Sequence, residues 1–175
     1  MDPPAGGPGE GPVEVRRART TDVRTIKELV DGYAARNLVL AKDLVTLYED
    51  VPDFWVAESG GTVLGCGALH VLWEDLGEIR TVAVSPAAQG RGIGHVIVDA
   101  LLGAARDLGL KRIFVLTFET AFFGRHGFAE ISGTPVSAEV YEQMRHSYDA
   151  GVAEFLDLPY VKPNILGNTR MLLTL

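Results

Sequence analysis

Apolar side chains recur every three or four positions in two parts of the chain, and this spacing predicts two amphipathic helices. The first helix is expected to be capped by Thr20, Thr21 or Asp22. Its buried stripe comprises Val23, Ile26, Leu29, Val30 and Tyr33. The second helix is expected over 92–108, with Gly109 as its C-terminal stop. Its buried face comprises Ile93, Ile97, Leu101, Ala105 and Leu108.

Other parts of the chain carry apolar residues that alternate with polar ones or follow one another closely, and these runs predict strands. The strands are expected over 13–19, 53–59, 62–73, 77–85, 111–118 and 169–175, with another beginning at Gly127. Gly60 and Gly61 separate the second strand from the third, which is a signal for a hairpin. The segment Lys111–Phe118 is nearly continuously apolar, as in strands that are covered on both faces.

The order of these elements predicts a mixed α/β sheet with a β-helix-β crossover from Glu78 to Phe118. Shorter helices are expected over 41–50, 120–126 and 137–147, and irregular structure over 158–168. The aromatic residues expected in the core are Phe118, Phe122, Phe123 and Phe128. We expect one domain over 13–175, preceded by a disordered tail over 1–12 that is almost all Pro, Gly and acid.

Composition narrows the classes of partner. The formal net charge of -7 argues against nucleic acid, which is bound by clustered Lys and Arg, and favours a small ligand. Neither a signal peptide nor an apolar run of about eighteen residues is present, so no membrane partner is expected. The single cysteine, Cys66, excludes an intrachain disulfide, which fits a cytoplasmic protein. A homodimer is compatible with these features.

The segment "SPAAQGRGIGHV" (Ser85 to Val96) places three glycines between a predicted strand and a predicted helix. Unpaired amides at a helix start form an anion site when side chains leave room, and Arg91 adds a cation. A dinucleotide fingerprint would need glycine where His95 stands, and a nucleotide-triphosphate loop would need G-K-[S/T]. The pattern Q-x-x-G-x-G fits "QGRGIG" (Gln89 to Gly94) in full. A turn without a ligand is the structural alternative.

That pattern follows "TVAVSP" and precedes "FFGRHGF", and in this order it resembles the GNAT family of acetyl-CoA-dependent N-acetyltransferases. The resemblance covers nearly all of Val13 to Leu175. It implies an α/β GNAT fold with a mostly antiparallel sheet, splayed central parallel strands and flanking helices. It also implies acetyl-CoA as co-substrate and no metal. The implied pyrophosphate contacts are Gln89, Gly90, Arg91, Gly92, Ile93, Gly94 and His95, and the implied strand contacts are Val82, Ala83 and Val84.

Within that family, "FWVAESGGTVLGCGALH", "GEIRTVAVSP" and "GLKRIFVLTFETAFFGRHGF" look like the catalytic domain of amino-acid N-acetyltransferases, in particular the N-acetylglutamate synthases that open arginine biosynthesis. Such synthases often carry an additional amino-acid-kinase domain. The chain is too short to hold one, so it resembles a stand-alone catalytic domain.

The reaction needs a base that takes a proton from the attacking ammonium group. Glu78 is the leading candidate, acting through water, because it begins the strand beside the cofactor, and His70 is the second candidate. Many GNAT enzymes protonate the leaving thiolate from a tyrosine, but Phe123 stands at that position. Either the thiolate leaves unaided, or another tyrosine substitutes: Tyr141, Tyr148 or Tyr160. A backbone amide of the Glu78 strand, such as that of Val82, would polarise the thioester.

A glutamate-like substrate carries carboxylates, which Arg and Lys bind best. The candidates are Lys42, Arg80 and Arg170. A lysine where the resembling synthases have arginine leaves the acceptor open between glutamate, glutamine and another small amino acid. Two further interpretations are an acetyltransferase for another amine, such as a protein lysine or an antibiotic, and a non-catalytic acyl-CoA-binding module.

Each site residue also has a structural alternative. Glu78 and Arg80 would lie on a solvated strand edge, and Lys42 and Arg170 would be surface charges. His70 would be a satisfied core histidine, and Cys66 a small buried hydrophobe and not a thiol nucleophile.

Overall fold

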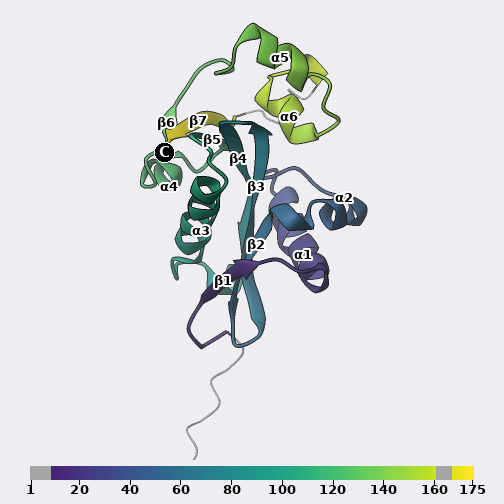
Figure 1. Ribbon diagram of the computed structural model, residues 1–175. Helices are drawn as coiled ribbons and strands as arrows, with labels where there is room; N and C mark the ends of the chain where they lie inside the picture. The colour runs from purple at the N-terminus through teal and green to yellow at the C-terminus, as the bar shows by residue number, and fades with distance from the viewer. Residues whose placement is uncertain (1–8, 161–166) are drawn as a thin grey trace, which may run out of the picture. The chain divides into compact units, whose positions relative to one another are not determined.

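The computed structural model describes residues 9–160 and 167–175 (Figure 1). Seven strands of this part of the chain form one sheet in the order β1-β2-β3-β4-β5-β7-β6. They are β1 Glu14–Arg17, β2 Phe54–Ser59, β3 Thr62–Trp73, β4 Leu76–Val84, β5 Arg112–Thr117, β6 Ala129–Glu130 and β7 Thr169–Thr174. The pairs β1–β2, β2–β3, β5–β7 and β6–β7 are antiparallel, and β4–β5 is parallel. The predicted mixed, mostly antiparallel α/β sheet is confirmed.

The helices are α1 Val23–Ala34, α2 Leu44–Glu49, α3 Ile93–Asp107, α4 Thr120–Gly124, α5 Ala138–Met144 and α6 Ala150–Phe155. Short 3-10 turns occupy Thr20–Asp22, Val51–Asp53 and Pro86–Ala88. All the α-helices except α6 lie in helical segments that the sequence predicts. Helix α6 was not predicted from the sequence, and its N-terminus is capped by Asp149, whose carboxylate accepts a hydrogen bond from the Val152 amide at 2.9 Å.

The chain divides into two compact units. The first comprises residues up to His70 together with Ile79–Leu108, and the second comprises Val71–Glu78 together with residues from Gly109 onward. Residues 1–8 of the predicted tail lie outside the described residues. Gly9 and Gly11 are described, and their carbonyl groups accept hydrogen bonds from Arg91 and Ser59. Among the described residues, no helix is both long enough and apolar enough to cross a bilayer.

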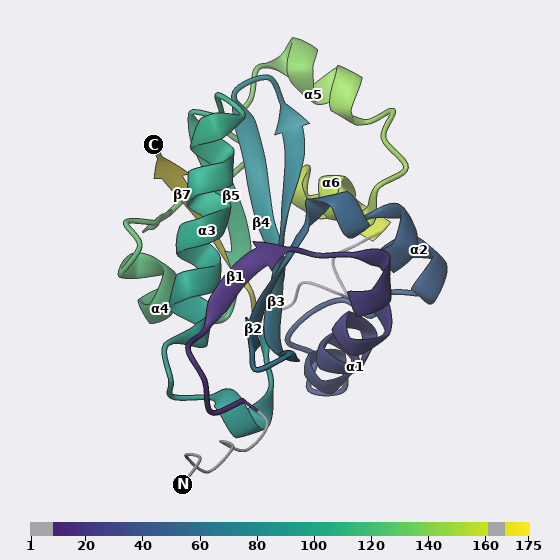
Figure 2. The same ribbon diagram turned by 60° about the horizontal axis from the view of Figure 1, so that its bottom comes forward.

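Alternation along β3 gives the first unit two different faces. The side chains of Cys66 and Ala68 join the core formed with α1 and α2, where Val23, Ile26 and Val30 are buried as predicted. The intervening positions are Gly65 and Gly67, and they face α3, which lies across the sheet from α1 (Figures 1 and 2). These glycines therefore let α3 approach the strand closely.

Close approach at Gly67 leaves no room for a side chain. A Cβ atom there would lie 2.8 Å from the Cγ2 of Ile97 and 3.0 Å from the Cδ1 of Leu101. A Cβ contact of 2.8 Å is shorter than real Cβ atoms show and one of 3.0 Å is tighter than most, so the neighbouring atoms of α3 or of β3 would have to shift. The helix that begins at the glycine-rich segment is thus set against the sheet by the absence of side chains on β3.

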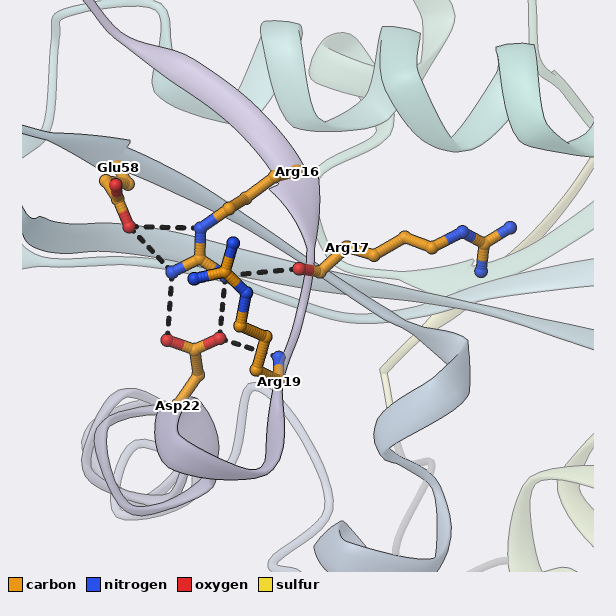
Figure 3. A network of polar contacts seen from close by, with 5 residues as sticks. All are labelled: Arg16, Arg17, Arg19, Asp22 and Glu58. Carbon is orange, nitrogen blue, oxygen red and sulfur yellow. Dashed lines mark hydrogen bonds and ion pairs between the residues drawn. The ribbon is translucent and has the colours of Figure 1, made fainter.

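The start of α1 is fixed to the sheet by a network of charged groups centred on Arg16 (Figure 3). Its Nη1 and Nη2 atoms lie 2.8 and 3.0 Å from the two carboxylate oxygens of Asp22, and Nη2 lies 2.6 Å from Glu58 Oε2. Asp22 also accepts the Arg19 amide at 2.7 Å. Asp22 stands at the N-cap position that the sequence predicts, but it makes no side-chain capping hydrogen bond to α1.

The same network shifts the proton affinities of its members. Hydrogen bonding to Arg16 holds the pKa of Asp22 below its ordinary value, against an opposing effect of burial. Hydrogen bonding to Asp22 raises the pKa of Arg16 above its ordinary value. The network therefore favours the ionised state of both groups in the folded protein.

Two predicted core positions are wrong. Leu108 is 58% exposed because α3 ends at Asp107 and Gly109, with φ 82°, turns the chain away from the helix axis. Phe118 is 40% exposed because β5 ends at Thr117. Phe123 and Phe128 are buried as predicted, with ring centroids 5.3 Å apart, and Phe122 is half-buried.

Candidate active site

The glycine-rich segment forms the turn between β4 and α3 in the first unit. Gly90 and Gly92 have φ angles of 78° and 75°, a conformation in which a side chain is strained, and a Cβ at either would meet no described atom within 4 Å. The first hydrogen bond of α3 runs from the Val96 amide to the Gly92 carbonyl at 3.2 Å. The preceding amides of Ile93, Gly94 and His95 stand at the positive end of the helix. This arrangement suits an anion.

The side chains of this turn differ in exposure. Gln89 and Arg91 are exposed, whereas Ile93 is buried and anchors the first turn of α3 in the core. Arg91 Nη2 donates a hydrogen bond to the carbonyl of Gly9 at 3.0 Å. The guanidinium of Arg91 is therefore held by the backbone of the segment that precedes β1.

The strand contacts implied by the resemblance lie just before this turn. Ala83 is fully buried, whereas Val82 and Val84 are half-buried. The preceding residue, Thr81, has a φ of 59°, which is unusual for a β-branched residue and marks an irregularity in β4. Both backbone groups of Val84 are hydrogen-bonded to the hydroxyl of Tyr33.

His70, near the end of β3, is paired with a carboxylate that sequence reasoning missed. Its Nδ1 atom lies 2.6 Å from Asp53 Oδ2, and both side chains are partly exposed. An ionised carboxylate can only accept, so Nδ1 carries the hydrogen in this pair. In the neutral ring Nε2 is then the basic nitrogen. His70 is a half-buried, oriented histidine and not one enclosed in the core.

Glu78 and Arg170 are brought near one another in the second unit. Glu78 is only 5% exposed and is paired with Phe114 of β5, so a solvated strand edge does not describe it. The guanidinium carbon of Arg170 lies 4.9 Å from the centre of the Phe114 ring. Burial lowers the pKa of Arg170, and the charges of Asp157 and Glu78 oppose that effect.

Arg170 is extensively hydrogen-bonded to backbone carbonyl groups. It donates to Gly133 at 3.1 Å, to Glu154 at 3.2 Å and to Phe155 at 2.5 Å. A guanidinium has five N–H donors, and within residues 9–160 and 167–175 these three bonds leave two of them for another acceptor. Arg170 is therefore a structural element of the second unit as well as a candidate substrate contact.

Lys42 and Arg80 both belong to the first unit. Lys42 is half-buried and immediately precedes Asp43, the N-cap residue of α2. Arg80 is half-buried on β4, two residues after Glu78. Of the three predicted carboxylate contacts, two therefore lie in the first unit and Arg170 lies in the second.

The predicted alternatives for a general acid differ in how they are placed. Tyr141 donates its hydroxyl hydrogen to the Leu156 carbonyl at 3.2 Å, whereas Tyr148 and Tyr160 are exposed.

Cys66 is fully buried, which raises the pKa of its thiol to about 12 and disfavours the nucleophilic thiolate. Among the described residues, no group of three or more His, Cys, Asp and Glu side chains is arranged to hold a metal ion.

Comparison with known proteins agrees with the sheet topology. The sequence profile of the Acetyltransferase (GNAT) family matches residues 24–130. An amino-acid acetyltransferase of Mycobacterium tuberculosis is 71% identical over 164 residues, which are 92% of this chain and 94% of that protein. A crystal structure from the same organism, in complex with CoA and NLQ, matches with a TM-score of 0.90 and 70% identity, covering 93% of this chain and 99% of that one.

A more distant likeness concerns the fold alone. The N-acetylglutamate synthase of Neisseria gonorrhoeae, complexed with coenzyme A and N-acetyl-glutamate, matches with a TM-score of 0.75 and 24% identity. The match covers 95% of this chain and 36% of that one. Since the family profile covers more than half of the sequence and the mycobacterial relative is similar over almost its whole length, this chain belongs to the GNAT family of acetyltransferases.

Proposed function

We propose that the chain is an amino-acid N-acetyltransferase that moves the acetyl group of acetyl-CoA to the α-amine of glutamate or glutamine, as the first step of arginine biosynthesis. The observation that carries this proposal is the 71% identity, over 92% of the chain, to an amino-acid acetyltransferase. The buried thiol of Cys66 fits a cytoplasmic location.

The turn from Gln89 to His95 is proposed to hold the pyrophosphate of acetyl-CoA. Its support is local: two glycines with positive φ, open space beside them, and the amides at the start of a fifteen-residue helix. Arg91 would supply the cation. The adjoining backbone of Val82, Ala83 and Val84 is proposed to contact the pantetheine arm, and the Val82 amide to polarise the thioester carbonyl.

Glu78 is proposed as the base that removes a proton from the substrate ammonium through a water molecule. The amine then attacks the thioester carbonyl carbon, the carbon–sulfur bond breaks, the nitrogen gives up its second proton to water, and the acetyl group remains on nitrogen. A thiol has an ordinary pKa of about 8.5, so the thiolate is a competent leaving group and can take its proton from solvent. This route needs no tyrosine at the position of Phe123.

The carboxylates of the amino acid are proposed to be bound by Lys42, Arg80 and Arg170. For Arg170 the proposal uses the two N–H groups left after its three backbone hydrogen bonds. These cations favour a carboxylate-bearing acceptor over a cationic one such as an aminoglycoside or a protein lysine.

The proposal is tested by measuring thiol release from acetyl-CoA with a panel of free amino acids, an aminoglycoside and a lysine-containing peptide. We expect the highest kcat/KM with glutamate or glutamine. A highest value with the aminoglycoside or the peptide would overturn the substrate assignment. Binding of acetyl-CoA without turnover of any amine would instead indicate a non-catalytic acyl-CoA-binding module.

A further inference from the structure

The hydroxyl group of Tyr33 is hydrogen-bonded to both the N–H and the C=O of Val84, the last residue of β4. The Val84 amide donates to the hydroxyl oxygen of Tyr33 at 3.1 Å, and the same hydroxyl donates to the Val84 carbonyl at 3.3 Å. Tyr33 lies in the last turn of α1, and both residues belong to the first unit. The contact joins positions that are 51 residues apart in the sequence.

These two backbone groups point away from the neighbouring strand β3. The Ser85 amide donates to the Leu64 carbonyl of β3 at 2.7 Å. Because successive residues of an extended strand direct their N–H and C=O groups to opposite edges, those of Val84 face the other edge of β4. The parallel pairing of β4 covers Leu76, Gly77 and Glu78, and the strand continues beyond them to Val84. The Tyr33 hydroxyl is therefore hydrogen-bonded to the edge of β4 beyond the segment Leu76–Glu78 that pairs with β5.

A tyrosine hydroxyl can give one hydrogen bond and accept another, and so can an amide group. An extended chain that carries amides and runs along a strand edge would pair with the N–H and C=O of Val84 in the same way as a neighbouring strand does. The pantetheine arm of CoA is such a chain. Tyr33 thus fills the two backbone positions that an amide of the arm would use.

We propose that Tyr33 competes with the pantetheine arm for the backbone of Val84, and so sets the affinity of the enzyme for its cofactor. Without cofactor the hydroxyl satisfies Val84, and with cofactor it gives up both hydrogen bonds. This inference rests on the proposed placement of acetyl-CoA along Val82, Ala83 and Val84. It makes Tyr33 a determinant of cofactor affinity that acts through the strand edge.

The ring of Tyr33 has a separate structural role. It packs against the core formed by α1, α2 and the sheet, and the guanidinium carbon of Arg36 lies 4.8 Å from its centre. Exchange of the whole side chain would disturb this packing. The substitution Tyr33→Phe keeps the ring and removes only the hydroxyl, which makes it the appropriate variant.

The experiment compares the Kd of CoA for the full chain and for its Tyr33→Phe variant by titration calorimetry, with thermal unfolding as a check on folding. Since a net hydrogen bond in a protein is worth a factor of about three to ten in an equilibrium, we expect Tyr33→Phe to bind CoA about three- to tenfold more tightly. An unchanged or a higher Kd overturns the inference. The control is Tyr48→Phe, an exposed tyrosine of α2, for which the Kd stays at the parent value.

A second measurement needs no substitution. In the free protein, NMR should show a nuclear Overhauser effect between the ring of Tyr33 and the amide of Val84, and saturation with CoA should remove it. Its persistence in the complex overturns the inference while leaving the proposed cofactor intact. If neither the parent nor the variant binds CoA, the proposed function fails, and this inference fails with it.

Discussion

Nδ1 of His70 lies 2.6 Å from Oδ2 of Asp53, which joins the end of β3 to the residue that precedes β2. This contact fixes the orientation of the imidazole, and His70 is the second candidate for the base that deprotonates the substrate amine. An oriented histidine can act as a base, and variants at Asp53 and at Glu78 distinguish the role of His70 from that of Glu78.

We expect Asp53→Asn to lower kcat by less than about threefold, because Glu78 and not His70 is proposed to take the proton. The pair is partly exposed, so the loss in unfolding free energy should be at most about 1 kcal/mol. Steady-state kinetics and thermal unfolding measure both quantities. A fall in kcat of about a hundredfold or more, shared by His70→Gln, would assign the base to His70.

For Glu78→Gln we expect a large loss of kcat, in contrast to the small loss expected for Asp53→Asn. General-base catalysis contributes roughly 10²–10⁴-fold, so we expect a loss of kcat of at least about a hundredfold at neutral pH. The loss should shrink as the pH rises, because a growing fraction of the amine is then already deprotonated. The measurement is kcat against pH, with Glu74→Gln at the exposed hairpin as the matched control. A pH-independent ratio between parent and variant would remove Glu78 as the base.

The contrast between these two carboxylates shows what the sequence could predict. Glu78 stands in a strand that its own apolar neighbours identify, so the local pattern was sufficient to place it in β4. Asp53 lies outside its strand, and its partner is set by the pairing of β2 with β3, which shifts register between Ala57 and Glu58. The local residue pattern does not predict that shift in register.

Secondary-structure elements could be predicted where particular residues determine the local backbone conformation. Contacts between elements could not. Gly60 and Gly61 marked the β2–β3 hairpin, and both have positive φ. Helix α6 was missed from the sequence, although Asp149 is a suitable cap for its six residues. The contact between Tyr33 and Val84 depends on how α1 lies against the sheet, which no local pattern encodes.

Close packing of α3 against β3 predicts opposite effects for two glycine substitutions. Gly67→Ala should lower the unfolding free energy by about 1–3 kcal/mol, because the new Cβ would lie 2.8 Å from Ile97. Gly32→Ala is the control: it lies in α1 with no described atom within 4 Å of its Cβ position, and should gain about 0.5–1 kcal/mol. Denaturant unfolding measures both, and equal effects would contradict the packing argument.

Arg170→Lys should affect stability and substrate binding together. A lysine cannot reproduce the fork that reaches Gly133, Glu154 and Phe155, so we expect a loss of about 1–3 kcal/mol in unfolding free energy. If Arg170 also binds the substrate carboxylate, KM for the amino acid should rise at least about tenfold while KM for acetyl-CoA stays unchanged. Arg145→Lys, at an exposed pair with Glu142, is the control. An unchanged amino-acid KM would leave Arg170 with the structural role alone.

The Arg16–Asp22 pair predicts a pH dependence of stability with a defined sign. The pKa of Asp22 is lowered on folding from its ordinary value of 3.8, chiefly by hydrogen bonding to Arg16. A carboxylate with a depressed folded pKa contributes stability that is complete above its unfolded pKa and is lost as the pH falls through the folded one. The contribution should therefore be constant near neutral pH and disappear in acid below 3.8.

We accordingly expect the free energy of unfolding of Asp22→Asn to be about 1–3 kcal/mol lower than that of the parent at pH 7. This difference should narrow in acid, since protonation of Asp22 removes the same charge from the parent. Asp31→Asn, at an exposed pair with Lys27, should stay within about 0.5 kcal/mol at either pH. Denaturant unfolding at a series of pH values measures both variants. A difference for Asp22→Asn that is independent of pH would show that the hydrogen-bond geometry, and not the charge of Asp22, stabilises the start of α1.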